Sequence, residues 1–388
     1  MSNPLSIRPL VAHMPESQIR EVANAGLGVA GVLPFWFGES DMPTTAEVTA
    51  AATAALARGE TFYSHNLGLP ELRQAIAGYA SALHGPIGAD RIAVTSSGVN
   101  ALMIANQLLL EAGDEVVVIT PVWPNLVWQP RLLGAQVREV SLAPTADGWQ
   151  LEIEQLLAAI TPATRLLILS SPNNPTGWTL TGAEQQRILD HCRHTGTWIL
   201  ADEVYERLYY VPGATAAPSF LDIAQAADRL IVVQSFSKSF LMTGWRLGWL
   251  VVPASLVRQV GVLIEYNTSC APVFVQRAGL AAIDNAATVA PLVAHLRQCR
   301  DTLVNALAPL PGVQVIPADG GMYVLLRVQG HDDSLALAKR LVVEARLGLA
   351  PGSAFGSAGE GWLRWCFASR ELGRLEEGAA RLQKFLVG

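Results

Sequence analysis

Lysine is rare in this sequence: among its 27 basic side chains, only three are Lys. An arginine side chain stays protonated and only donates hydrogen bonds, so it cannot act as a nucleophilic amine. One of the three lysines, Lys238, stands in the run Ser235-Phe236-Ser237-Lys238, directly after the apolar stretch 230–233. A lysine whose pKa is lowered can lose its proton and condense with a carbonyl group. Lys238 is therefore a candidate catalytic amine, and an ordinary exposed lysine is the alternative interpretation.

Other features are also missing, and each absence argues against a class of protein. A membrane span needs an uninterrupted apolar run of about 18 residues, and the sequence contains none. The N-terminal segment also lacks the apolar core of a signal peptide. A net charge of -6 without a long Lys/Arg run gives no footprint for nucleic acid. The cysteines lack metal-type spacing and read as reduced thiols: Cys192, Cys270, Cys299 and Cys366. We expect a cytoplasmic location, a small-molecule partner, no metal, no nucleic acid and no membrane.

The sequence does contain short apolar runs that alternate with longer amphipathic segments from about residue 90 to residue 260, which is typical of an α/β sheet. The expected strands are 91–95, 115–119, 136–140, 165–169, 198–201, 230–233 and 248–252. Helices are expected over 99–111 and 181–194, and Thr181 and Glu184 have the spacing of a capping box. A different order follows residue 285 and predicts a smaller α+β unit, with strands 313–316, 322–328 and 362–368.

Polar clusters follow the carboxyl ends of four expected strands. They are 95–98, 170–177, 202–205 and 235–238. In open α/β sheets the ligand crevice lies outside these strand ends. We therefore expect the four clusters to meet at one site.

Each cluster suits part of a charged, planar ligand. The run Ser97-Gly98-Val99 opens a helix, whose N–H groups and dipole favour an anion such as phosphate, although an ordinary N-cap is the alternative. Arg246 could hold the same anion or form a surface salt bridge. Asp202 ends a buried strand and needs a cationic partner, for which a protonated pyridine nitrogen would serve.

Three further side chains could contact the ring of such a ligand. Tyr205 offers a phenol, and Asn174 offers an amide, although Asn174 lies in a segment that also reads as a plain turn. Trp123 could stack on a planar ring or simply fill the core. An amine, an anion site, a nitrogen partner and a stacking ring together describe a pocket for pyridoxal 5'-phosphate held on Lys238.

The motifs Ser-Pro-Asn-Asn-Pro-Thr-Gly, Asp-Glu-Val-Tyr, Ser-x-Ser-Lys-Ser-Phe and Gly-Trp-Arg-Leu-Gly-Trp occur in this order and spacing. With these motifs the sequence resembles the class I/II aminotransferases, the aspartate aminotransferase-like enzymes of the fold type I pyridoxal-phosphate-dependent superfamily. The resemblance extends over essentially the whole chain. The resemblance implies a large domain at 47–288 with a mostly parallel seven-stranded sheet sandwiched by helices. It also implies a smaller α+β domain made of 1–46 and 289–388.

The resemblance also implies a role for each matching residue. Lys238 would carry the Schiff base and move the proton, Asp202 would hold the pyridine nitrogen protonated, and Tyr205 and Asn174 would hydrogen-bond the ring oxygen. Trp123 would stack on the ring. The phosphate contacts would be Ser97, Gly98, Val99, Ser235 and Arg246. Val99 departs from relatives that have a polar side chain there.

The substrate and the partner subunit are implied in the same way. Arg364, together with Asn174, would bind the substrate α-carboxylate, and the backbone of Gly38 would lie over the substrate. Tyr63 would reach the phosphate of the neighbouring subunit, which implies a homodimer with shared active sites.

The expected reaction transfers an amino group between an L-amino acid and a 2-oxo acid, and a carbon–sulfur β-lyase of the same fold is the alternative. The aromatic run Phe35-Trp36-Phe37 favours a hydrophobic substrate unless it belongs to the core. From the sequence, no second arginine can be assigned to a pocket for the side-chain carboxylate of a dicarboxylic substrate. Aspartate and glutamate nevertheless remain open as substrates.

Overall fold

The computed structural model describes residues 7–146 and 148–387. Its largest sheet has seven strands in the order β2-β10-β9-β8-β7-β3-β4. Strand β10 runs antiparallel to both neighbours, whereas all other neighbouring strands are parallel. The strands are β2 (Ile92–Thr95), β3 (Glu115–Thr120), β4 (Gln136–Ser141), β7 (Thr164–Ser170), β8 (Trp198–Asp202), β9 (Leu230–Ser235) and β10 (Gly248–Val251). The predicted seven-stranded, mostly parallel sheet is confirmed, with small shifts at the strand ends.

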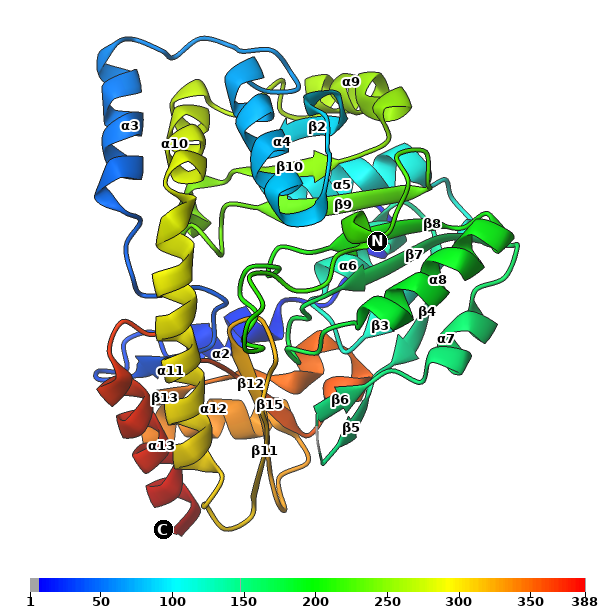
Figure 1. Cartoon of the computed structure of the whole chain (residues 1–388). Coiled ribbons are helices and arrows are strands. Elements are labelled where there is room, and N and C mark those ends of the chain that lie inside the picture. Colours follow the sequence, from blue (N-terminus) through cyan, green and yellow to red (C-terminus); the bar gives the residue numbers. More distant parts are fainter. Residues whose placement is uncertain (1–6, 147, 388) are drawn as a thin grey trace, which may run out of the picture.

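Helices cover both faces of the large sheet (Figure 1). Alternate side chains of a strand point to opposite faces of its sheet. Val117 and Leu167 therefore pack into one apolar cluster, and their neighbours Val116 and Leu166 pack into another. The first cluster includes side chains of α3 (Ala46–Ala57), α4 (Pro70–His84), α7 (Ile153–Ala159), α8 (Gly182–Thr195) and α10 (Val273–Asp284). The second includes those of α5 (Gly98–Leu109), α6 (Asn125–Leu132) and α9 (Val257–Asn267).

Two helices begin where the sequence predicts. At α8, Thr181 Oγ1 accepts from the N–H of Glu184 (3.2 Å) and the Glu184 carboxylate accepts from the N–H of Thr181 (2.8 Å), which confirms the capping box. At α5, Ser97 Oγ accepts from the N–H of Asn100 at 3.1 Å. Because α5 follows β2 directly, its N-terminus lies at the carboxyl end of that strand.

A second, antiparallel sheet has the order β11-β12-β15-β14. Its strands are β11 (Val313–Ile316), β12 (Tyr323–Val328), β14 (Ala350–Pro351) and β15 (Trp362–Cys366). The helices packed with it are α2 (Gln18–Ala25), α11 (Val289–Leu307), α12 (Ser334–Ala345) and α13 (Leu372–Val387). The remaining short elements are α1 (Pro9–Ala12), the pair β1 (Leu33–Pro34) and β13 (Leu347–Gly348), and the hairpin β5 (Ala143–Thr145) and β6 (Gly148–Gln150).

The two sheets share part of their cores. Leu326 and Leu363 belong to the core of the small sheet, whereas Leu325 and Trp362 of the same strands join the core of the large sheet. The two units are therefore packed against each other. The boundaries between them at 46/47 and 288/289 stay predictions.

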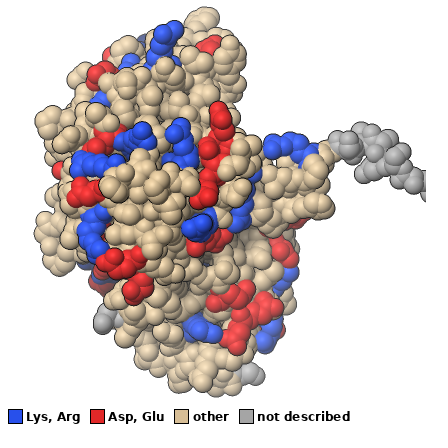
Figure 2. Space-filling model, turned by 90° about the vertical axis from the view of Figure 1, so that its right-hand side faces the viewer, with Lys and Arg blue, Asp and Glu red and all other residues tan. Residues whose placement is uncertain are grey.

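The surface in Figure 2 shows Lys and Arg side chains interspersed with Asp and Glu among the described residues of that face. Arg193 with Asp228, at 2.7 Å, is one such pair of opposite charges in the structure. Within the described residues no single helix is both long and apolar enough to cross a membrane. The pair Val273–Asp284 and Ala286–Leu307 meets both criteria together, with a bend of 66°.

Candidate active site

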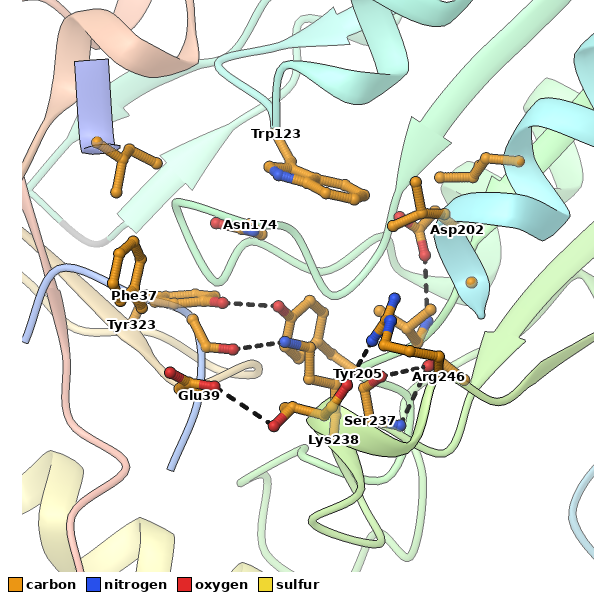
Figure 3. A pocket seen from close by; sticks show the side chains of 18 of the residues that line it. Phe37, Glu39, Trp123, Asn174, Asp202, Tyr205, Ser237, Lys238, Arg246 and Tyr323 are labelled. Atoms are coloured by element: carbon orange, nitrogen blue, oxygen red, sulfur yellow. Dashed lines mark hydrogen bonds between the residues drawn. The ribbon is translucent and has the colours of Figure 1, made fainter. Parts of the chain in front are cut away.

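A cavity of about 580 Å³ lies at the carboxyl edge of the large sheet (Figure 3). Segments that follow five strands line it: Gly98 follows β2, Trp123 follows β3, Asn174 follows β7, Asp202 and Tyr205 lie at the end of β8, and Ser235 and Lys238 lie at the end of β9. Gly38, Tyr323 and Arg364 close the cavity from the small unit. The structure therefore brings the four predicted polar clusters together.

Lys238 lies at the centre of this cavity and is partly buried. Its Nζ donates to the carbonyl oxygen of Gly38 at 2.6 Å and lies 5.4 Å from the centre of the Tyr205 ring. Burial lowers the pKa of Lys238 from 10.5 to about 8, and the positive charge of Arg364 acts in the same direction. A substantial fraction of this amine is neutral near pH 8, so it is available as a nucleophile or a base.

Asp202 is a buried carboxylate with few partners. Only 4% of the residue is exposed, and its Oδ1 accepts one long hydrogen bond, from the N–H of Val204 at 3.4 Å. Burial raises the pKa of Asp202 to about 7, although the Val204 N–H and the charge of Lys238 oppose the shift. A cationic donor in the cavity would satisfy this side chain.

Two hydrogen-bonded pairs join the large unit to the small one inside the cavity. The hydroxyl groups of Tyr205 and Tyr323 are 2.7 Å apart, and burial raises the pKa of Tyr205 well above 10. Arg364 Nη1 donates to Asn174 Oδ1 at 2.9 Å, and its guanidinium lies 4.4 Å from the centre of the Tyr323 ring. Arg364 is 2% exposed and its buried Nε has no hydrogen-bond partner in the described part of the chain. This guanidinium therefore keeps donor capacity for an anion in the cavity.

Backbone and hydroxyl groups form a second anion-binding surface at the start of α5. Ser97 adopts φ 124°, which is uncommon for a residue with a side chain, and Gly98 places its Cα against Ser235, since a Cβ on Gly98 would lie 3.3 Å from Ser235 Cβ. Ser235 and Ser237 share a hydrogen bond of 2.9 Å between their hydroxyls. Arg246 lies beside them in a left-handed conformation (φ 56°), and it forms no ion pair with any described acidic side chain.

All but two of the predicted site residues line this cavity. Ser97 is not in the lining and instead caps α5, where its Oγ accepts from the N–H of Asn100. Tyr63 is not in the lining either, because it lies on the surface with 88% of its area exposed. Val99 does line the cavity, and its carbonyl oxygen accepts a hydrogen bond from Gln129 Nε2 at 3.2 Å. Of the aromatic run, Phe35 and Trp36 belong to the core of the small unit, whereas Phe37 lines the cavity.

Several lining residues had no assigned role from the sequence, and Tyr323, Ser237, Glu39 and Arg20 are among them. Tyr323 is fully buried, and a Cβ on Gly38 would lie 2.1 Å from its hydroxyl oxygen, so only glycine fits there. Arg20 of α2 lies at the cavity near Phe37, with 6.0 Å between its guanidinium and the Phe37 ring centre. The sequence alone assigned no second arginine to the site, and the fold brings Arg20 into the cavity lining.

Comparison with known proteins identifies the family. The model of the family "Aminotransferase class I and II" matches residues 33–382. The chain belongs to the class I and II aminotransferases. The predicted family, enzyme class and aminotransferase activity are thereby confirmed. Arg20 lies outside the residues that the family model matches.

Several relatives cover nearly the whole enzyme. An aspartate aminotransferase of Pyrococcus horikoshii is 31% identical over 96% of this chain and 95% of its own length. An aromatic-amino-acid aminotransferase of Thermococcus litoralis is 32% identical over 95% of each chain. The crystal structure of an aspartate aminotransferase from Thermotoga maritima has a TM-score of 0.92 with 29% identity, covering 98% of this chain and 100% of that one. The names of these relatives thus refer to different amino acids, whereas the Thermotoga maritima structure has the same fold as this chain.

Proposed function

We propose that the enzyme transfers amino groups between an L-amino acid and a 2-oxo acid with pyridoxal 5'-phosphate bound through Lys238. One observation carries this proposal: the amine of Lys238, with its pKa lowered to about 8, lies in one cavity with a buried carboxylate and an anion-binding surface. Each of these three groups fits one part of the cofactor, namely its carbonyl, its ring nitrogen and its phosphate.

The residues present fit the cofactor. Asp202 lacks a strong donor partner and suits a protonated ring nitrogen. The hydroxyls of Ser235 and Ser237, the N–H groups at the start of α5 and the unpaired Arg246 suit a phosphate. Trp123 lines the same cavity and would cover the ring, and Tyr205 and Asn174 would offer donors to its oxygen. These roles remain proposals.

The bound cofactor supplies an electron sink for negative charge that develops at the substrate Cα. In its neutral form, the amine of Lys238 would take the proton from Cα of the amino donor in one half-reaction and give a proton to Cα of the oxo-acid acceptor in the other, since it is a basic group in the lining of the cavity. Arg364 binds the α-carboxylate with its free donors, while Asn174 holds the guanidinium in place. The carbonyl of Gly38 orients the Lys238 amine.

The variant Lys238→Ala tests the proposal, with Lys339→Ala as the matched control, because Lys339 forms an exposed ion pair with Glu21. We expect Lys238→Ala to lose the cofactor absorbance of the purified enzyme and at least about 1,000-fold in transamination rate. The control keeps both. Near-normal transamination by Lys238→Ala would contradict the assignment.

A second assay separates transamination from the alternative β-lyase reaction. The enzyme is mixed with a cysteine conjugate in the absence of any oxo acid. We expect little pyruvate and thiol compared with the rate of amino transfer. Rapid release of both products would instead favour the lyase.

We further propose that Arg20 binds the second carboxylate of a dicarboxylic substrate. Its guanidinium reaches the substrate side of the cavity, near Phe37, and forms no ion pair within the described residues. An unpaired arginine beside an aromatic ring accepts a carboxylate and still tolerates an apolar side chain. The guanidinium of Arg20 beside the ring of Phe37 would suit both aspartate and aromatic amino acids, which the names of the relatives give.

The proposed assembly is a homodimer, and the proposed location is the cytoplasm. Phe62, Tyr63 and Tyr266 are aromatic side chains with more than four fifths of their area exposed. Their segments are neighbours, because the N–H of Ser64 donates to Cys270 Sγ at 3.4 Å. Exposed aromatic side chains of this kind are enriched at protein interfaces. In the proposed dimer, Tyr63 would reach the cofactor phosphate of the partner subunit.

A further inference from the structure

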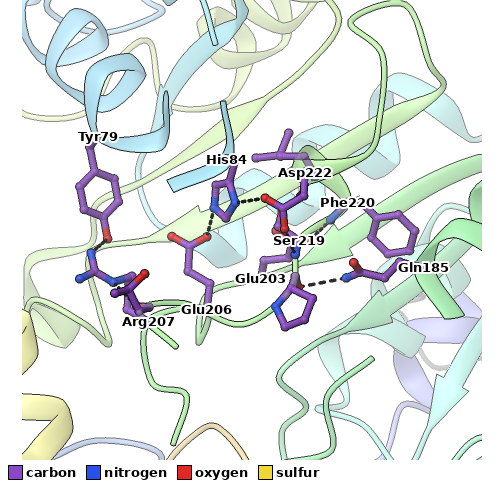
Figure 4. A network of polar contacts seen from close by, with 12 residues as sticks. Tyr79, His84, Gln185, Glu203, Glu206, Arg207, Ser219, Phe220 and Asp222 are labelled. Atoms are coloured by element: carbon purple, nitrogen blue, oxygen red, sulfur yellow. Dashed lines mark hydrogen bonds and ion pairs between the residues drawn. The ribbon is translucent and has the colours of Figure 1, made fainter. Parts of the chain in front are cut away.

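A second polar cluster lies behind the turn that carries Asp202 and Tyr205, outside the cavity (Figure 4). It joins three segments: the turn itself, the short helix η2 (Phe220–Asp222) and the end of α4. Its central side chain is His84, the last residue of α4, which is 2% exposed. None of the roles proposed above uses this cluster.

The turn presents some of its residues to the cavity and others to the cluster. Asp202 and Tyr205 line the cavity, whereas Glu203 and Glu206 point into the cluster (Figures 3 and 4). Glu203 is 1% exposed and accepts from the hydroxyl of Ser219 (2.5 Å) and from the N–H of Phe220 (3.1 Å). The side chains that anchor the turn are therefore direct sequence neighbours of those that face the cavity.

His84 bridges the turn to η2 through both ring nitrogens. Nε2 lies 3.0 Å from Glu206 Oε2, and Nδ1 lies 2.8 Å from Asp222 Oδ1. A neutral imidazole has one N–H and could donate to only one carboxylate, whereas the imidazolium donates to both. Burial disfavours the charged ring, but the hydrogen bonds to Asp222 and Glu206 outweigh it and raise the pKa of His84 to about 10. His84 therefore supplies a positive charge between the buried Glu206 and the partly exposed Asp222.

The same helix also holds the segment of Lys238. Tyr79 of α4 packs against Phe240, with 5.9 Å between the ring centres, and Phe240 lies two residues after Lys238. The Tyr79 hydroxyl accepts from Arg207 Nη1 at 2.9 Å. Helix α4 thus contacts both the Asp202 turn and the Lys238 segment, and it can fix the distance between them.

We propose that His84 is a positioning residue, whose ionic bridge between Glu206 and Asp222 holds Asp202 and Tyr205 in register with Lys238. This inference rests on the proposed function, since Asp202 and Tyr205 contact the cofactor there. Without the charge of His84, Glu206 becomes a buried carboxylate without a cationic partner. Glu206 would then move toward water, and the backbone from Asp202 to Arg207 would move with it.

The variant His84→Gln removes the charge and leaves an amide whose N–H donors share one nitrogen, so that it cannot replace both ring nitrogens of His84 as donors. Its matched control is His191→Gln on α8, where His191 Nε2 lies 2.9 Å from the carbonyl oxygen of Ile160, away from the cavity lining. The measurements are amide hydrogen exchange of the peptide 202–208 in cofactor-free protein, the dissociation constant of pyridoxal 5'-phosphate, and kcat and KM. All are taken at a temperature at which every variant is folded.

We expect His84→Gln to speed exchange in 202–208 about tenfold. We also expect it to weaken cofactor binding and lower kcat by about tenfold each, with a smaller change in KM. His191→Gln changes none of these. If His84→Gln does not fold, Asp222→Asn serves instead, because the Asp222 side chain is 38% exposed and its loss leaves the Glu206 bridge intact. It should shift all three quantities in the same direction by a smaller factor.

Exchange, cofactor affinity and kcat that all stay within about twofold of wild type would overturn the inference. Failure of the proposed function looks different, since wild-type protein would then not bind pyridoxal 5'-phosphate at all. The exchange measurement on cofactor-free protein would still decide whether His84 holds the turn.

Discussion

The surroundings of the Lys238 amine are formed by single residues from distant parts of the chain. Gly38 accepts its hydrogen bond, burial and in addition the charge of Arg364 lower its pKa, and Tyr205 places a ring beside it. Lys238, Asp202 and Asn174 could be predicted from the sequence because each belongs to a motif at a strand end. Tyr323 could not, since its partner Tyr205 is 118 positions away and no local pattern links them.

The variant Gly38→Ala should damage the site through Tyr323. Its new Cβ would lie 2.1 Å from the Tyr323 hydroxyl oxygen, so either that ring or the carbonyl bonded to Lys238 must move. We expect kcat/KM to fall on the order of 100-fold in steady-state assays. In a Tyr323→Phe background, which lacks the clashing oxygen, the further loss should be much smaller. Equal losses in both backgrounds would show that the contact is not the cause.

The variant Arg20→Ala should change substrate preference rather than chemistry. We expect KM for dicarboxylic substrates to rise about tenfold or more, with little change for neutral and aromatic amino acids, because only the former lose an ion pair. Arg20→Lys keeps the charge and should retain part of the preference. A panel of amino donors with one 2-oxo acid gives the comparison. Equal effects on acidic and apolar donors would contradict the proposed role of Arg20.

At the scale of elements, most strands of the large sheet were predictable because they contain apolar runs of four residues, as in β3, β7 and β9, and follow one another in a regular order. The short pairs β1 with β13 and β5 with β6 were not, since two or three residues carry no periodicity. The role of α4 also required the structure. Its sequence shows a helix, but only the fold places His84 between Glu206 and Asp222.

The bridge at the end of α4 predicts a pH-dependent contribution to stability. The folded-state pKa of His84, about 10, is raised above its ordinary value of 6.5, so the contribution is complete below about pH 6.5 and is lost as the pH rises through about 10. The charged groups that face His84 are Glu206, Asp222 and, farther away, Glu203.

Chemical denaturation of wild type and His84→Gln between pH 6 and pH 10 measures this contribution. Near pH 6 we expect the variant to unfold with a free energy lower by on the order of 3 kcal/mol, because it leaves a buried acid unpaired. The difference should shrink toward pH 10. His191→Gln provides the control, and a difference that stays constant over this range would exclude an ionic role for His84.

At the scale of the whole molecule, the cavity lies between two units whose cores meet, and both contribute side chains to it. Length and strand order were enough to predict the two units. The boundary between the units and the assembly of subunits stay predictions. The predicted assembly depends on Tyr63, which is exposed and lies outside the cavity lining of its own chain.

Mixing two defective variants tests the proposed dimer. Lys238→Ala lacks the amine, and Tyr63→Ala lacks the contact offered to the neighbouring subunit. In a hybrid dimer one site combines Lys238 of one chain with Tyr63 of the other and is complete. At limiting cofactor, the unfolded and refolded mixture should therefore be more active than either parent. A mixture no more active than the average of its parents would contradict shared sites.

The central claim is that Lys238 binds pyridoxal 5'-phosphate covalently. Borohydride reduces a carbon–nitrogen double bond to a stable amine, so treatment of the cofactor-loaded enzyme followed by peptide mass spectrometry locates the attachment. We predict a phosphopyridoxyl group on the peptide that contains Lys238, and none on those with the other two lysines, Lys339 and Lys384. A label on either of these lysines, or no label on a transaminating enzyme, would contradict the account.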